Sequence, residues 1–332
     1  MDPTFFFELS GESKDMPAAE AKKCIEAECD SFDIISEGPG YIIASFPEEK
    51  LDDIADRIAL THSIGRYIGT YDPDNAAYLF DLELPDGTFA IRAKRFEGMM
   101  KDIDSQKIIR DIGGIFSRTN DVDLKDPEII IRMQMCDMLH LYIEERTIDR
   151  NLLETRKVSE RPFFSPISLH PKYARALINL TGARRGSIVL DPFCGTGGLV
   201  IEAASMGMIT IASDFDEEMV IGTMENMEFY GLDLDDHEVI DIKDIPERFH
   251  DIDIVVTDPP YGRSTRTGGE DAADIQRIAM SKIPKVLKHN GKAGIILPYE
   301  SGPTAMELES VFKQHVHGSL SRYYHVFKNT EQ

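Results

Sequence analysis

The chain has 332 residues, which is longer than one hydrophobic core usually supports and therefore predicts two or three domains. A hydrophobic content of 42% and a charged content of 29% are typical of a folded globular protein. The 36 lysines and arginines against 59 aspartates and glutamates give a net charge of -23, which disfavours nucleic-acid backbones and anionic membranes as partners.

The N-terminal residues lack the basic and apolar segments of a signal peptide, and no apolar stretch approaches the roughly 18 residues of a membrane span. We therefore expect a cytoplasmic protein. The four cysteines contain no C-x-x-C pair, so reduced thiols are expected. The cysteines and the nine histidines show no metal-ligand spacing, which predicts no metal site.

The first 60 residues combine two helical patterns, at 18–29 and 48–60, with short apolar runs such as 41–44, and predict a small α+β unit. Residues 61–150 predict a compact α/β module. Its expected elements are a strand at 89–95, a helix at 105–117, and a hairpin of strands 128–135 and 138–143. Residues 151–170 are polar and contain Pro162 and Pro166, so we expect a semi-extended linker there.

From residue 171 to 332, helices and strands alternate, which predicts a mostly parallel, doubly wound sheet. The expected strands are 187–190, 209–213, a third ending near 239–242, 252–257 and 292–297, and the expected helices are 171–180, 198–206, 217–230 and 271–287. Residues 318–327 alternate in polarity and predict an antiparallel edge.

A glycine turn follows the strand at 187–190, with the sequence Asp191-Pro-Phe-Cys-Gly-Thr-Gly-Gly198. Such a turn lets a ligand approach the backbone at the carboxyl end of a strand. The dinucleotide motif G-x-G-x-x-G fails because Val200 occupies its third glycine position. Asp191 would repel a diphosphate and suit a cation such as a methionine ammonium. The alternative is a tight strand-to-helix turn with a solvent-facing aspartate.

Acidic residues also end the next two strands. Asp214 lies about 20 positions after the glycine turn, where a carboxylate accepts both hydroxyls of a ribose. Asp216 is the competitor, but its place before Glu217 is that of a helix N-cap. Asp241 offers a carboxylate to an adenine edge, or is part of a surface loop.

The sharpest signal is Asp258-Pro259-Pro260-Tyr261 at the end of a buried strand. Prolines remove backbone donors, so the carbonyls of this turn are expected to be unpaired and to face the cleft. The Asp258 carboxylate and the Pro259 carbonyl could each accept one N–H of a planar amino group, while Tyr261 stacks on the base. The alternative is a rigid turn with a packing tyrosine.

These motifs together make residues 171–332 resemble a class I S-adenosylmethionine-dependent methyltransferase of the amino-methylating kind. Residues 89–95 and 122–128, with Gly113-Gly114, are similar to a THUMP domain preceded by a ferredoxin-like segment. Together with His170-Pro171 and 174–180, the whole chain resembles the archaeal tRNA (guanine-10, exocyclic 2-amino) methyltransferases. The organisation implied is a ferredoxin-like segment (1–60), a THUMP-like RNA-binding domain (61–150), a linker (151–170) and a Rossmann-like methyltransferase domain (171–332).

The resemblance implies transfer of one or two methyl groups from S-adenosylmethionine to guanosine 10 of tRNA. We also expect a monomer. The resemblance assigns catalysis to Asp258, Pro259 and Tyr261. The cofactor residues are Asp191, Gly195, Thr196, Gly197, Asp214, Phe215 and Asp241. The net charge of -23 requires a local basic face, for which we select Lys94, Arg95, Lys101, Lys107 and Arg110.

Four other functions fit parts of the sequence. Another tRNA or rRNA guanosine could be the target, and a DNA amino-methyltransferase would fit the Asp258 motif but not the THUMP-like half. A non-catalytic tRNA-binding protein is disfavoured because every motif carboxylate is present. A nicotinamide dehydrogenase is disfavoured because Val200 occupies the third glycine position of the dinucleotide-binding motif. The basic residues could also be ordinary solvated charges.

Overall fold

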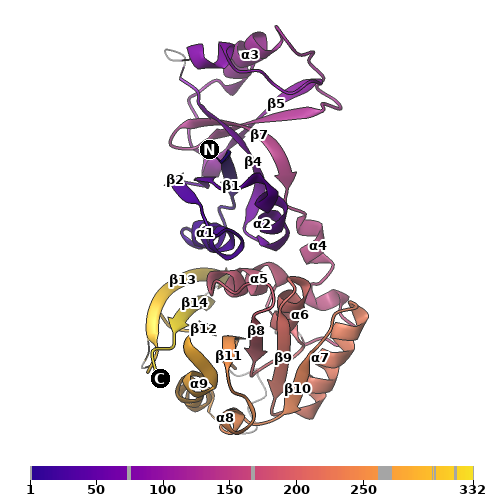
Figure 1. Cartoon of the computed structure of the whole chain (residues 1–332), viewed down its shortest axis with the longest axis vertical. Coiled ribbons are helices and arrows are strands. Elements are labelled where there is room, and N and C mark those ends of the chain that lie inside the picture. Colours follow the sequence, from indigo (N-terminus) through magenta and orange to yellow (C-terminus); the bar gives the residue numbers. More distant parts are fainter. Residues whose placement is uncertain are drawn as a thin grey trace. The chain divides into compact units, whose positions relative to one another are not determined.

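The computed structural model describes residues 2–72, 76–165, 169–260, 271–300, 302, 304–317 and 320–331. It divides the chain into two compact units, which Figure 1 colours from indigo to yellow along the sequence. The first unit contains Met1–Ala55 and Leu60–Ile148, and the second contains Asp56–Ala59 and Asp149–Gln332.

The first unit is built on one sheet, whose described strands follow the order β2-β3-β1-β4-β7-β6-β5. Neighbouring strands are antiparallel except for β5 and β6, which are parallel. The strands are β1 Thr4–Leu9, β2 Asp33–Gly38, β3 Tyr41–Ser45, β4 Thr61–Thr70, β5 Phe89–Arg95, β6 Ile129–Met135 and β7 Leu139–Thr147. The sheet is continuous across residue 60, because β4 pairs with both β1 and β7.

Helices α1 (Met16–Glu28), α2 (Leu51–Arg57) and α3 (Ser105–Phe116) accompany this sheet, with short 3-10 turns η1 Glu48–Lys50, η3 Ala77–Phe80 and η4 Phe96–Gly98. The sequence of α3 shows why it forms. Asp104 caps its first turn by accepting hydrogen bonds from the backbone N–H of Gln106 and Lys107. Ile108, Ile112 and Phe116 recur every four residues and are buried in the same core as Phe89.

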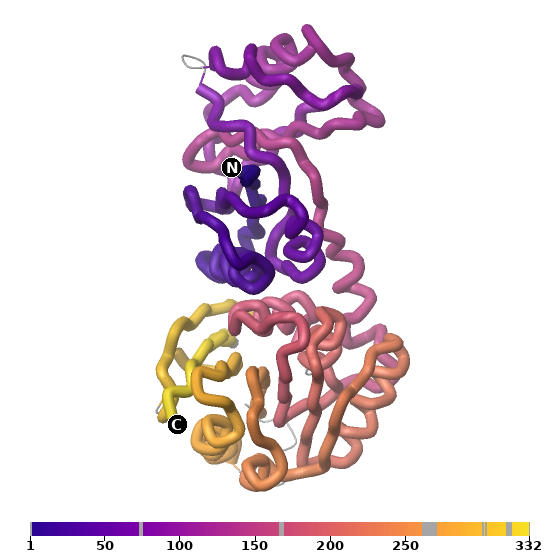
Figure 2. Tube along the Cα trace, viewed as in Figure 1, coloured from indigo at the N-terminus to yellow at the C-terminus, as the bar shows by residue number. Residues whose placement is uncertain are grey.

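The second unit is built on a second sheet, whose described strands follow the order β10-β9-β8-β11-β12-β14-β13. Its strands are β8 Ile188–Asp191, β9 Ile209–Asp214, β10 Asp236–Val239, β11 Ile252–Thr257, β12 Leu287–Leu297, β13 Glu307–His317 and β14 Leu320–Lys328. All neighbours are parallel except β14, which is antiparallel to β12 and to β13. The predicted fold class, a mostly parallel sheet with an antiparallel edge, is confirmed, and Figure 2 shows this edge in yellow.

The helices of the second unit are α4 Arg150–Glu154, α5 Pro171–Leu180, α6 Gly198–Ser205, α7 Glu217–Phe229, α8 Ile245–Arg248 and α9 Ala272–Val286, with a 3-10 turn η5 Val158–Glu160. None of the helices in the described ranges has the length and apolar character that a membrane span requires.

One local expectation is wrong. The linker was expected to be semi-extended, but α4 and η5 lie in it, because Asp149 accepts a hydrogen bond from Asn151 N (2.9 Å) and caps a helix. The third strand of the second unit was expected to end near 239–242, and β10 ends at Val239, the first residue of that range.

Candidate active site

The two sharpest sequence motifs meet at one edge of the second sheet. β8 and β11 are parallel neighbours, with Leu190 opposite Val255. Asp191 ends β8, and Asp258 follows the last residue of β11, so both motifs lie at the carboxyl ends of adjacent strands. Thr257 Oγ1 donates a hydrogen bond to Asp191 Oδ1 at 2.8 Å and joins the two strand ends directly.

The glycine turn between β8 and α6 requires its glycines. Gly195 and Gly197 have φ angles of 50° and 80°, the left-handed region that favours glycine. A Cβ on Gly197 would lie 3.0 Å from the Thr223 side chain. Thr223 Oγ1 also donates to Gly195 O at 3.0 Å, and Cys194 N donates to Ser213 O at 2.9 Å. Contacts with β9 and α7 therefore hold the turn in this shape.

Asp191 is buried, with 1% of its surface exposed. Burial raises the pKa of its carboxyl to about 7, against the hydrogen bonds from Thr257 and from the backbone N–H of Phe193, which favour the charged form. The nearby carboxylates of Asp214 and Asp258 raise this pKa further. A bound cation would favour the ionised carboxylate, so the chemistry of this position suits a positively charged ligand.

Asp214 ends β9 and lies beside the glycine turn. Its Oδ2 accepts from Gly195 N and its Oδ1 accepts from Asp216 N, both at 3.1 Å. Burial raises the pKa of Asp214, and the backbone hydrogen bonds lower it. Asp216 caps α7 by accepting from Glu218 N at 3.0 Å, as predicted. Phe215, between the two aspartates, exposes 42% of its surface.

Asp241 lies two residues beyond β10 rather than at its end. Its carboxylate accepts from Lys243 N at 2.9 Å and forms an ion pair with Lys243 Nζ at 3.8 Å. Ile240 N donates to Asp214 O at 2.9 Å, which places this segment next to the end of β9. The structure thus brings Asp241 to the same edge of the sheet, with its side chain 43% exposed.

The Asp258-Pro-Pro turn is anchored by a residue that sequence reasoning missed. Both carbonyls of this turn were expected to be unpaired, but Gln276 Nε2 donates to Pro260 O at 3.0 Å. Gln276 is buried on α9, beside Ile275 and Ala279. A polar glutamine among the apolar residues of one helix face is the sequence feature that could have identified this residue. Pro259 and Pro260 are buried, whereas Tyr261 lies outside the described residues.

Arg161 supports the glycine turn from the predicted linker and was also missed. Its Nη1 donates to Thr196 Oγ1 at 3.2 Å, and its Nε donates to Arg156 O at 3.1 Å. The side chain is 3% exposed, and burial lowers the pKa of its guanidinium. Asn226 Nδ2 donates to Thr196 O (2.9 Å) and to Phe163 O (2.7 Å). The segment after α4 therefore packs on the turn and is part of the site's support.

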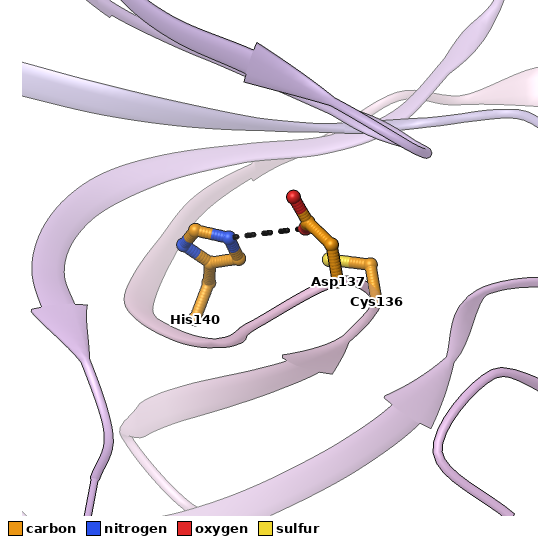
Figure 3. Close-up of side chains that lie close together, drawn as sticks. All are labelled: Cys136, Asp137 and His140. Carbon is orange, nitrogen blue, oxygen red and sulfur yellow. Dashed lines mark ion pairs between the residues drawn. The ribbon is translucent and has the colours of Figure 1, made fainter.

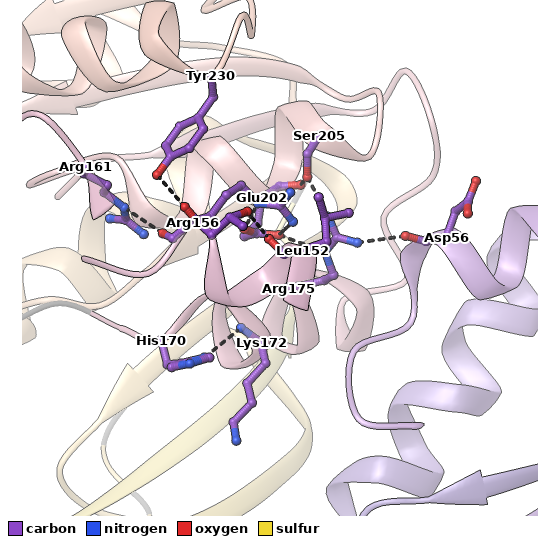
Figure 4. A network of polar contacts seen from close by, with 11 residues as sticks. Asp56, Leu152, Arg156, Arg161, His170, Lys172, Arg175, Glu202, Ser205 and Tyr230 are labelled. Atoms are coloured by element: carbon purple, nitrogen blue, oxygen red, sulfur yellow. Dashed lines mark hydrogen bonds and ion pairs between the residues drawn. The ribbon is translucent and has the colours of Figure 1, made fainter. Parts of the chain in front are cut away.

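A second polar network lies at α6 (Figure 4). Glu202 is fully buried and accepts two hydrogen bonds from Arg156, at 2.7 and 3.1 Å, and one from Arg175 Nε at 2.8 Å. Arg175 also donates to Ser205 Oγ and to Asp56 O, at 2.7 and 2.8 Å. These bonds join the segment after α4 and helix α5 to α6, the helix that begins at the glycine turn.

The five basic residues selected from the sequence fall into two groups. Lys94 forms an ion pair with the buried Glu8, and Arg95 donates to Met100 O (3.2 Å) and Ile103 O (2.6 Å). These two side chains therefore make bonds within the first unit, although the Lys94 side chain is 46% exposed. The other three, Lys101, Lys107 and Arg110, are exposed.

Comparison with known proteins gives consistent matches over the whole chain. Residues 159–318 match the RMKL-like methyltransferase domain, and residues 76–144 match the THUMP domain. The chain is 33% identical to a tRNA (guanine(10)-N2)-dimethyltransferase of Methanothermobacter thermautotrophicus, over 96% of this chain and 98% of that protein. The crystal structure of TrmN from Thermus thermophilus matches with a TM-score of 0.56 and 20% identity, over 98% of this chain and 99% of that chain. The structure of SMU.472 complexed with SAH matches with a TM-score of 0.53 and 16% identity, over 100% of both chains.

Proposed function

Because the chain belongs to the family of archaeal tRNA (guanine(10)-N2)-dimethyltransferases, we propose that it methylates the exocyclic 2-amino group of guanosine 10 in tRNA. The methyl donor is S-adenosylmethionine, which is a sulfonium cation with an ammonium group. The observation that carries the proposal is the hydrogen bond between Thr257 and Asp191, which joins the cofactor turn to the Asp258-Pro-Pro turn at one sheet edge.

The residues at this edge fit the cofactor. The buried carboxyl of Asp191, whose pKa of about 7 would fall beside a positive charge, suits the methionine ammonium. The turn Gly195-Thr196-Gly197 lets the backbone approach the ligand, because neither glycine carries a Cβ. Asp214 would hold the ribose, and Phe215 and Asp241 would border the adenine.

Asp258 and Pro259 would hold the guanine amino group. The carboxylate of Asp258 and the carbonyl of Pro259 each accept one N–H, which directs the nitrogen lone pair toward the methyl carbon. S-adenosylmethionine would supply the methyl group as its carbon–sulfur bond breaks, and would leave as S-adenosylhomocysteine. The proton released from the amino nitrogen would pass to the Asp258 carboxylate that accepts its N–H. The hydrogen bond from Gln276 fixes the turn that carries both acceptors. Tyr261 would stack on the base.

The first unit would bind the tRNA. We propose that residues 1–60, 61–150 and 171–332 are three domains and that 151–170 link the last two. The RNA contacts would lie in 61–150. Lys101, Lys107 and Arg110 would contact phosphates, because their side chains are exposed on or before α3. Lys94 and Arg95 would shape that surface through their internal bonds. We propose a monomer that works in the cytoplasm.

The direct test is nucleoside analysis. Unmodified tRNA transcript is incubated with the enzyme and S-adenosylmethionine that carries a deuterated methyl group, digested, and analysed by mass spectrometry. Labelled N2-methylguanosine, followed by N2,N2-dimethylguanosine, is expected. Label on adenosine, cytidine or a ring nitrogen of guanosine would overturn the proposal.

A further inference from the structure

Three side chains of the types that bind metal ions gather at the tip of the β6–β7 hairpin in the first unit: Cys136, Asp137 and His140 (Figure 3). Their donor atoms lie within 4.8 Å of one another, and His140 Nε2 is 3.9 Å from Asp137 Oδ1. In Figure 3 the imidazole and the carboxylate point toward each other from the two sides of the turn. Thiolate, imidazole and carboxylate are the ligand types of zinc.

His140 supplies an independent sign of a ligand. The residue is 2% exposed, and its Nε2 has no hydrogen-bond partner among the described residues, although it faces the other two groups. Its Nδ1 is 3.1 Å from Tyr67 Oη. A metal-binding histidine usually uses its second ring nitrogen in this way, which fixes the ring so that the first nitrogen meets the metal.

The other two groups also have suitable surroundings. Tyr41 Oη donates to Asp137 Oδ2 at 3.4 Å. Asp137 Oδ1 accepts from Met138 N at 3.0 Å and lies 3.9 Å from His140 Nε2. Cys136 Sγ is 3.6 Å from Met138 O, and its side chain packs beside Tyr142 and Phe6.

We propose that Cys136, Asp137 and His140 bind one Zn²⁺ ion, with a water molecule as the fourth ligand. A thiolate and a carboxylate together neutralise the two positive charges, so the complex suits a site walled by aromatic rings. Zinc bond lengths of about 2.0–2.3 Å require the donors to approach by about 1 Å. Asp137 can supply this movement, since its side chain is 43% exposed. The sequence predicts no metal site because one Cys-x-x-x-His pair is no zinc motif.

Binding requires Cys136 to lose its proton. The Sγ–H bond breaks as the Zn–S bond forms, and the proton leaves to solvent.

The test uses the full chain, stripped of metal by a chelator and titrated with Co²⁺ and then Zn²⁺. We expect one equivalent of Co²⁺ to give a thiolate-to-cobalt charge-transfer absorption, which Zn²⁺ then removes. Asp137→Asn should fold normally because the side chain of Asp137 is exposed, and it should weaken Zn²⁺ binding by at least about 10-fold. Cys136→Ser should abolish the absorption. Cys29→Ser is the matched control, because Cys29 is also a buried thiol with a raised pKa, and it should leave the absorption unchanged.

Three results would each overturn the proposal: a wild-type chain without the absorption, an absorption that survives in Cys136→Ser, or equal zinc affinity in wild type and Asp137→Asn. If Cys136→Ser does not fold, Asp137→Asn alone decides between the outcomes.

Discussion

Arg161 Nη1 donates a hydrogen bond to Thr196 Oγ1 at 3.2 Å and so ties a buried guanidinium to the middle of the glycine turn. Thr196 was selected from the sequence as a cofactor residue, whereas Arg161 lies in a segment expected to be a linker. The bond shows that part of this segment belongs to the support of the proposed cofactor site.

Removal of the Thr196 hydroxyl should therefore weaken cofactor binding. Thr196→Val keeps the shape of the side chain but removes the acceptor, and bonds to charged groups contribute about 1.5–3 kcal/mol. Calorimetry with S-adenosylhomocysteine should show an affinity about 10-fold to 100-fold lower. Thr196→Ser, which keeps the hydroxyl, is the control and should bind nearly as wild type. Wild-type affinity in a folded Thr196→Val would show that the bond between Arg161 and Thr196 does not support cofactor binding.

Asp191 should make the stability of the cofactor-free protein fall as the pH rises. Its pKa is about 7 in the folded chain, against about 4 in an unfolded one, so between these values the folded state holds one extra proton. The contribution of Asp191 to the free energy of unfolding is therefore fully present below pH 4 and is lost as the pH rises through 7. This contribution amounts to at most about 4 kcal/mol.

Urea unfolding at pH 5 and pH 8 checks this dependence. Asp191→Asn cannot ionise, so it should be more stable than wild type at pH 8, with a smaller difference at pH 5. The exposed Asp241→Asn is the control and should follow wild type at both values. Equal pH dependence in wild type and Asp191→Asn would show that Asp191 is not the group responsible.

Asp258→Ala should reduce methyl transfer while cofactor and tRNA affinities stay nearly unchanged. The carboxylate is proposed to hold the amino group in the reacting complex, and loss of one such preorganised contact costs about 100-fold to 1,000-fold. Asp258→Asn should be milder, because its carbonyl still accepts one N–H. Single-turnover rates measure both variants, and wild-type rates in both would exclude Asp258 from the mechanism.

The structure separates two roles for basic residues in the first unit. Lys94 pairs with Glu8, and hydrogen bonds from Lys94 and Tyr142 lower the pKa of Glu8 against the effect of burial, which raises it. Lys94→Ala should therefore destabilise the protein by about 1–3 kcal/mol, because it leaves a buried carboxylate without its cation. Urea unfolding measures this loss, and a wild-type midpoint would show that the pair contributes nothing.

Lys107→Ala and Arg110→Ala should instead weaken tRNA binding without loss of stability. If each side chain neutralises one phosphate, its removal lowers the slope of binding against salt by about 0.7–0.9. Filter binding across a salt series measures this slope, with Lys285→Ala as a matched control on an exposed helix position of the second unit. Unchanged slopes in both variants would place the RNA on another surface.

Patterns with strong local causes were predictable from the sequence. The bounds of α5 follow from Pro171 at its first turn, and β11 follows from an apolar run that ends at a proline pair. β13 was missed because Glu307–His317 is polar, and its pairing with β14 comes from the rest of the sheet. The positions of the four carboxylates at this sheet edge were predictable because each lies at the end of a strand or within two residues of it.

The supports of the site were less predictable, because they depend on long-range contacts. Arg161 contacts Thr196, which is 35 residues away, and Gln276 contacts Pro260, which is 16 residues away. Neither partner can be chosen from local periodicity. Lys94 likewise resembles any exposed lysine on a strand until its pairing with Glu8 is seen.

Methylation of the 2-amino group of guanosine 10 is tested most directly by removing that single group from the RNA. A tRNA transcript with guanosine at position 10 is compared with one that carries inosine there, which lacks only the 2-amino group, under single-turnover conditions with S-adenosylmethionine. The proposed function predicts one or two methyl groups on the guanosine transcript and none on the inosine transcript. Equal methylation of the two transcripts would contradict it.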